Sequence, residues 1–158
     1  MPDRLGGLSA MRFADWLLLW TLALAWYGVG CVWLVQLVAW PLFGFVGRNE
    51  FAAYHQRWWD GIKIPILVPG TLAFAGGIGL LFARPAAVPV ALIGAGIAME
   101  IVVYLLTAFW YGPQQARLHD TSSPAFARLK TAHWVRTALL SGYGLVLLAA
   151  VVLRIGAA

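Results

Sequence analysis

Residues 16–43 read WLLLWTLALAWYGVGCVWLVQLVAWPLF and contain no charged side chain. About 20 apolar residues in a helix are enough to cross the roughly 30 Å hydrocarbon core of a bilayer. A secretory signal peptide has a shorter apolar core that ends at a small-residue cleavage site, and this run is too long for one. The stretch therefore predicts a retained first transmembrane helix.

The composition of the whole chain also indicates a membrane protein. Its 158 residues are 62% hydrophobic and 11% charged, whereas an average soluble domain is about 25% charged. The single cysteine, Cys31, excludes an internal disulfide. The net charge of +5 is spread over several connections without forming a stripe, so we predict no nucleic-acid partner.

Three further apolar segments follow the first. The predicted transmembrane helices cover residues 16–43, 64–83, 87–111 and 132–153, and Ser123 before Pro124 places the start of the fourth helix near residue 124. Backbone groups in lipid must hydrogen-bond internally and no alternating strand pattern occurs, so the segments are helices. The sequence predicts one all-α domain over residues 1–158: a four-helix transmembrane bundle with short interfacial helices in the 1–2 and 3–4 connections.

Prolines and small residues predict local features of these helices. Pro41 is expected to kink the first helix near its end, and Pro65 and Pro69 are expected to make the start of the second irregular. Small residues spaced four apart, such as Ala73 with Gly77, predict close helix packing.

The basic residues predict the orientation of the bundle. Four of the 11 basic residues lie at the termini and the 2–3 turn, and seven lie in the two longer connections and at the membrane entry of the fourth helix. The positive-inside bias places those connections in the cytoplasm and both termini outside.

Two polar side chains inside apolar segments are candidates for binding. Glu100 lies in the middle of the third helix, where a carboxylate costs at least about 2.5 kcal/mol, so it should face the bundle interior together with Tyr104. On a functional interpretation, Glu100 accepts a proton or anchors a ligand. On a structural interpretation, it forms a hydrogen bond with another helix. Gln36 in the first helix has the same two interpretations, a ligand contact or an interhelical hydrogen bond.

Two histidines are candidates for chemistry. His55 follows Tyr54 on a helical face that also carries Trp58. Trp58 and Trp59 suit a membrane interface, but that role does not explain the histidine. His133 precedes Trp134 and is followed by Arg136, three residues away on the same side of the helix. This is the pattern of a base with an anion-stabilising cation, or of an arginine that reaches lipid phosphate.

No metal site is predicted. The third histidine, His119, lies in a polar loop, and the three histidines lack a recognisable ligand spacing. The chain also lacks a phosphate-binding glycine loop, a nucleophile elbow and a CXXC motif.

Four segments carry a resemblance to a known family. They are VQLVAWPLFGFVGRNEFAAYHQ (residues 35–56), IPILVPG (64–70), YGPQQARL (111–118) and FARLKTAHWVRTALLSGYG (126–144). They resemble a bacterial family of small four-helix membrane proteins, grouped with the anthrone-oxygenase-like domain of unknown function. His133 and Trp40 stand where those proteins often have asparagine and tyrosine.

The resemblance implies a cofactor-independent oxygenase for polycyclic phenolic substrates in a bacterial plasma membrane. Such an enzyme removes a proton beside a carbonyl and holds the anion while oxygen attacks. His55 or His133 is the expected base, and Arg136, Tyr54 or Gln36 the expected oxyanion partner. The predicted substrate contacts are completed by Glu100, Tyr104, Trp134 and Trp58.

The expected partners are the lipid bilayer and a hydrophobic, ring-containing small molecule, and a homo-oligomer is compatible with the sequence. Two alternatives stay open at this point. One is a non-catalytic accessory or assembly subunit, in which tryptophan and glycine serve packing alone. The other is a haem- or quinone-binding redox protein.

Overall fold

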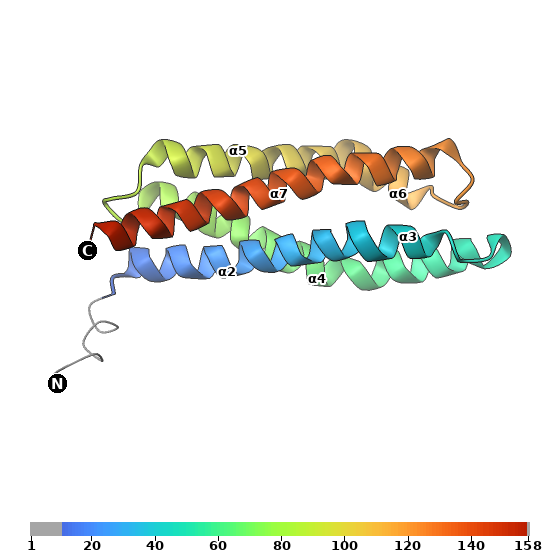
Figure 1. Cartoon of the computed structure of the whole chain (residues 1–158), viewed down its shortest axis with the longest axis horizontal. Coiled ribbons are helices and arrows are strands. Elements are labelled where there is room, and N and C mark those ends of the chain that lie inside the picture. Colours follow the sequence, from blue (N-terminus) through green and yellow to red (C-terminus); the bar gives the residue numbers. More distant parts are fainter. Residues whose placement is uncertain (1–10, 158) are drawn as a thin grey trace, which may run out of the picture.

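Four long helices make up the computed structural model, which describes residues 11–157 (Figure 1). The helices Phe13–Phe43, Arg48–Phe82, Val90–Ala116 and Pro124–Gly156 are each long and apolar enough to cross a membrane. Their outer surface carries large exposed apolar side chains, including Phe82 and Phe109, which suit contact with lipid tails. The chain is therefore an all-α, multi-pass membrane protein built as a four-helix bundle, as the sequence predicted.

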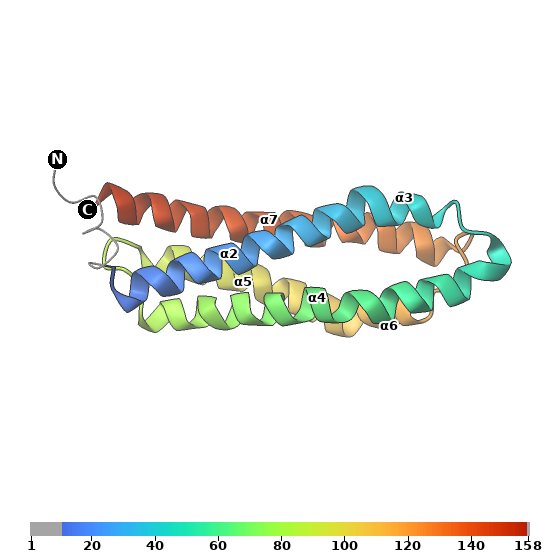
Figure 2. The same ribbon diagram turned by 90° about the horizontal axis from the view of Figure 1, so that it is seen from below.

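The first and third membrane spans are each made of three consecutive elements. The first contains α2 (Phe13–Leu34), η1 (Val35–Ala39) and α3 (Trp40–Phe43), and the third contains α5 (Val90–Leu106), η2 (Thr107–Tyr111) and α6 (Gly112–Ala116). The second and fourth spans are the single helices α4 (Arg48–Phe82) and α7 (Pro124–Gly156). The start of α2 and the end of α7 lie at one end of the bundle, and α3 and α6 lie at the other (Figures 1 and 2).

The expected interfacial helices are not separate elements. Residues 48–63 form the first turns of α4, and α6 continues directly from η2. Polar side chains on this part of α4 lie outside the hydrophobic stretch but do not interrupt its backbone hydrogen bonds. The helix also runs on through Pro65 and Pro69, where the sequence predicted irregular turns. Transmembrane helices tolerate proline when the freed backbone groups find other partners.

π-Helical turns precede the prolines near the ends of the first and third spans. In η1 the Trp40 N–H bonds to the Val35 carbonyl just before Pro41, and in η2 the Gly112 N–H bonds to the Thr107 carbonyl just before Pro113. Each turn inserts an extra residue into the helical ladder where proline removes a donor. The feature expected as a kink at Pro41 is thus a widened turn upstream of it.

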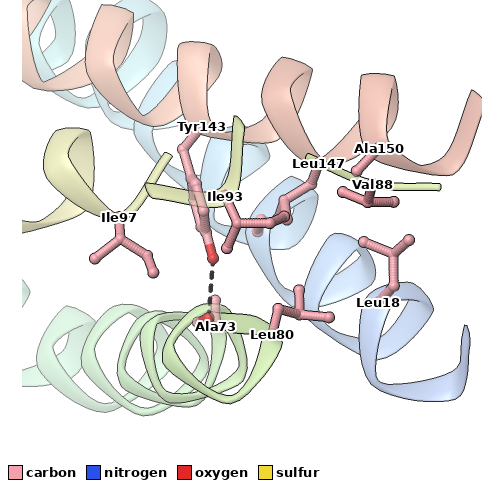
Figure 3. Close-up of a cluster of buried hydrophobic side chains, with 10 residues drawn as sticks. Leu18, Ala73, Leu80, Val88, Ile93, Ile97, Tyr143, Leu147 and Ala150 are labelled. Carbon is pink, nitrogen blue, oxygen red and sulfur yellow. Dashed lines mark hydrogen bonds between the residues drawn. The ribbon is translucent and has the colours of Figure 1, made fainter. Parts of the chain in front are cut away.

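The core at the terminal end of the bundle is organised around Tyr143 of α7 (Figure 3). Its hydroxyl donates to the Ala73 carbonyl of α4 at 3.0 Å. A Cβ added to Gly77 would lie 2.7 Å from the Tyr143 hydroxyl, and one added to Gly96 of α5 would lie 2.9 Å from its ring. Gly77, which the sequence assigned to close packing, therefore makes room for this tyrosine, and so does Gly96, which the sequence did not single out.

The fourth span begins where the sequence placed it. The Ser123 side chain accepts a hydrogen bond from the Phe126 N–H and caps α7, with Pro124 at the first helical position. In the preceding loop, the Ser122 hydroxyl and backbone N–H both donate to Asp120, which lowers the pKa of that carboxyl.

Candidate functional site

His133 is held in a buried hydrogen-bonded group where α7 meets η1. Its Nδ1 lies 2.8 Å from Gln36 Oε1 and 3.3 Å from Thr137 Oγ1, whose hydroxyl donates to the His133 carbonyl at 2.9 Å. An amide oxygen only accepts, and the Thr137 proton is already used, so the proton of the neutral ring lies on Nδ1. Nε2 keeps its lone pair and makes no hydrogen bond with the residues of the structure.

Arg136 lies one turn further along α7 without a counter-ion. Its guanidinium carbon is 5.4 Å from the centre of the Tyr111 ring, and its Nε is buried with no hydrogen-bond partner. Over residues 11–157 the ion pairs join Lys63 to Asp60 and Arg154 to Asp15, so neither involves Arg136. A desolvated charge without a partner is costly, so this position suits an anionic or strongly polar ligand.

His133 and Arg136 face a common space, here called the outer cavity, with a volume of about 190 Å³. It lies between α4 and η2, and its walls are largely aromatic and aliphatic. The lining residues are Val35, Trp58, Trp59, Ile62, Lys63, Ile66, Leu67, Thr107, Tyr111, Gly112, His133 and Arg136. Leu67 at its rim is 47% exposed, so the cavity reaches the side of the bundle that faces lipid.

A smaller inner chamber of about 60 Å³ lies deeper in the bundle. Glu100, Tyr104, Thr107 and Arg136 are its polar lining, so Arg136 borders both spaces. Glu100 is 3% exposed, as expected for an acid that faces the interior. Within the described chain it forms no ion pair and no hydrogen bond, whereas the Tyr104 hydroxyl lies 3.4 Å from Thr71 Oγ1.

His55 lies outside the outer cavity. Its Nε2 is 2.8 Å from Nε2 of the buried Gln115, and its ring stacks on Phe51 with 5.4 Å between centroids. Phe43 and Trp40 lie between the two histidines, since Phe43 contacts His55 at 5.7 Å and Trp40 contacts His133 at 6.2 Å between centroids. The sequence expected both histidines at one pocket, but only His133 borders it.

The remaining predicted site residues divide into two groups. Trp58 lines the outer cavity. Gln36 does not line it but contacts His133, which does. Tyr54 and Trp134 are 46% and 44% exposed and point away from the cavity. Trp134 instead packs edge-on against Trp33, with 5.6 Å between centroids.

Three contributors were not selected from the sequence. Thr137 lies one turn after His133, and Gln115 lies one turn after Tyr111, so a helical-face argument from each neighbour could have found them. Trp59 was assigned to interfacial anchoring, yet it lines the outer cavity beside Trp58.

The side chains offer little to a metal or a haem. No group of three or more histidine, cysteine or acidic side chains able to hold a metal ion occurs within residues 11–157. A haem between the two histidines would need a ring nitrogen of each, and His55 Nε2 is engaged by Gln115.

Searches against protein-family descriptions, curated proteins and solved structures found no match to this chain.

Proposed function

We propose that the protein binds an apolar, ring-containing molecule in the outer cavity, and removes a proton from a carbon of that molecule that is conjugated with a carbonyl group. The observation that carries this proposal is the pairing of an Arg136 guanidinium that forms no ion pair within residues 11–157 with the free lone pair of His133 Nε2 on one aromatic-lined space. A packing role for Arg136 would call for a carboxylate within ion-pair distance, and a packing role for His133 would call for a donor to Nε2.

The walls of the cavity support the class of substrate. Trp58, Trp59 and Tyr111 provide flat aromatic surfaces that suit a polycyclic ring system. The rim at Leu67 faces lipid, so a molecule dissolved in the bilayer reaches the cavity without crossing water.

The division of roles follows from the two side chains. His133 Nε2 accepts the proton from a ring carbon conjugated with a carbonyl, while Gln36 and Thr137 hold the imidazole in the tautomer that leaves Nε2 basic. Arg136 binds the oxyanion that forms on the carbonyl oxygen.

In the oxygenase form of the proposal, dioxygen is the oxidant. It adds to the ionised carbon to give a peroxide, and cleavage of the O–O bond releases water as the second ring carbonyl forms. Anthrone and dioxygen thus give anthraquinone and water, with atoms and electrons balanced. The chain's own contribution is to remove the proton and to hold the anion.

Binding and turnover test the proposal with the purified protein in detergent. Anthrone turnover is followed by oxygen uptake, and binding of a hydroxylated anthraquinone is followed by quenching of tryptophan fluorescence. Arg136→Gln should weaken binding about ten- to hundredfold, as expected for loss of a charged hydrogen bond. His133→Gln should lower turnover by about 10²–10⁴-fold and change binding little.

Matched controls come from the same end of the bundle. Arg128 and His119 are exposed, so Arg128→Gln and His119→Gln should leave both readouts unchanged. If Arg136→Gln and His133→Gln lower only thermal stability, the chain acts as a non-catalytic subunit. A Soret band in the purified protein would favour the haem-binding alternative.

A further inference from the structure

Glu100 is a buried titratable group that the proposed reaction does not use. It shares the inner chamber with Arg136, and the two side chains are not close enough to form an ion pair. Resting on the proposed function, we propose that Glu100 compensates the charge of Arg136 in the empty protein and takes up a proton when an oxyanion enters the outer cavity. Ligand binding is then coupled to the uptake of one proton.

The charge count around Arg136 supports this coupling. With Glu100 ionised and the outer cavity empty, the two charges cancel. An oxyanion bound at Arg136 adds a second negative charge, and a net charge inside a bilayer-spanning bundle is strongly disfavoured. Protonation of Glu100 restores neutrality, so Arg136 has one anionic partner at a time.

Among residues 11–157, Arg136 is the group next to Glu100 that carries a charge at neutral pH. From α7 it is faced by Arg136 and Tyr143, and from its own helix by Tyr104. The parts of α2 and α4 that line the chamber are apolar or glycine: Leu24, Ala25, Gly28, Val32, Ile66, Leu67, Gly70 and Ala73. The tyrosines keep their protons, and the Tyr143 hydroxyl donates to the Ala73 carbonyl.

The inner chamber has room for water molecules that can deliver the proton to Glu100. The chamber volume of about 60 Å³ is enough for a few water molecules, since one water molecule needs roughly 10–15 Å³ of such space. The side chains of Glu100, Tyr104, Thr107 and Arg136 provide the polar partners that such waters need.

The pH dependence of anion binding tests the coupling. The probe is anthraquinone-2-sulfonate, whose charge does not change between about pH 5.5 and 8.5, and unsubstituted anthraquinone is the neutral control. The anion binds the form of the protein in which Glu100 is protonated. Above the pH at which Glu100 ionises in the empty protein, the Kd for the sulfonate should therefore rise by up to about tenfold per pH unit. The neutral probe should show no such rise.

Two variants identify the side chain that takes up the proton. Glu100→Gln cannot ionise and should bind the sulfonate with a Kd that no longer rises with pH. His133→Gln should keep the rise, which separates Glu100 from the other titratable group beside Arg136. A rise that persists in Glu100→Gln, or disappears in His133→Gln, overturns the inference.

Infrared spectroscopy tests the coupling on the unmodified protein, so the result does not depend on the folding of a variant. Infrared difference spectra at about pH 8 should show the C=O stretch of a protonated carboxylic acid appearing as the sulfonate binds. Saturable sulfonate binding with no such band and no pH dependence overturns the coupling and leaves the proposed function standing. Absence of saturable binding of either probe contradicts the proposed function, and the coupling falls with it.

Discussion

His133 Nδ1 and Gln36 Oε1 lie 2.8 Å apart, although 97 residues separate them along the chain. A second pair, His55 with Gln115, is formed at the same distance of 2.8 Å. The first and second spans form one helical hairpin, and the third and fourth spans form the other. In both pairs the histidine and the glutamine come from different hairpins. These crossed pairs fix how the two hairpins meet at the end of the bundle that holds the outer cavity.

Replacing Gln36 with leucine removes the main acceptor of the His133 Nδ1 proton. The buried N–H then has only the longer contact to Thr137, so we expect a loss of about 1–3 kcal/mol in the free energy of unfolding. The tautomer is also less strictly fixed, so turnover should fall more than binding. Unfolding in mixed SDS micelles and oxygen uptake measure the two effects. Gln56→Leu is the control because Gln56 is exposed and pairs with Asp60 on the surface; equal effects of the two variants would contradict the assigned role of Gln36.

His55 should behave as a packing residue. It is buried against Phe43 and Phe51 and does not border the outer cavity. His55→Ala leaves a void and an unpaired Gln115, so the free energy of unfolding should fall by about 2 kcal/mol or more. The affinity of the folded variant for a hydroxylated anthraquinone should match that of the parent protein. Lost binding with unchanged stability would instead place His55 in the site.

The hydropathy pattern was sufficient for the fold but not for the helix ends. An apolar run must become a helix in lipid, so four runs of sufficient length specify the bundle. Polar residues such as Arg48 and Arg57 end the apolar run without ending the helix, because exposed polar side chains on a helix carry no hydrogen-bond penalty. The pattern therefore placed the start of the second helix at residue 64 instead of Arg48.

The candidate site was only partly predictable for a geometric reason. The spacing correctly grouped His133 with Arg136, since residues three positions apart on a regular helix lie on the same side. Gln36 lies in η1, where the extra residue of a π-helical turn rotates the following side chains away from the regular register. Its pairing with His133 joins two helices that are distant in sequence, so the partner cannot be read from local spacing.

A methyl group at Gly96 should disrupt the packing around Tyr143. The added Cβ would lie 2.9 Å from Tyr143 Cδ2 and 3.1 Å from Val146 Cγ1, and the rigid ring cannot give way cheaply. We expect Gly96→Ala to lower the free energy of unfolding by about 1–3 kcal/mol, as overpacking does. Gly94→Ala on the same helix meets no atom within 4 Å, so it should be neutral or slightly stabilising. Unfolding in mixed micelles compares the two, and equal stabilities would show that α5 and α7 are not packed as closely as described.

The ion pair between Asp15 and Arg154 should stabilise the terminal end of the bundle by joining the first and last helices. Arg154 Nε donates to Asp15 Oδ1 at 2.6 Å, and a second nitrogen donates to Oδ2 at 3.3 Å. The Asp15 side chain is 7% exposed and that of Arg154 32%, so a double-mutant cycle with Asp15→Asn and Arg154→Gln should give a favourable coupling. The exposed pair of Asp60 and Lys63 is the control, and its cycle should give a smaller coupling. A coupling at the terminal pair no larger than this would mean that water screens it as fully as a surface contact.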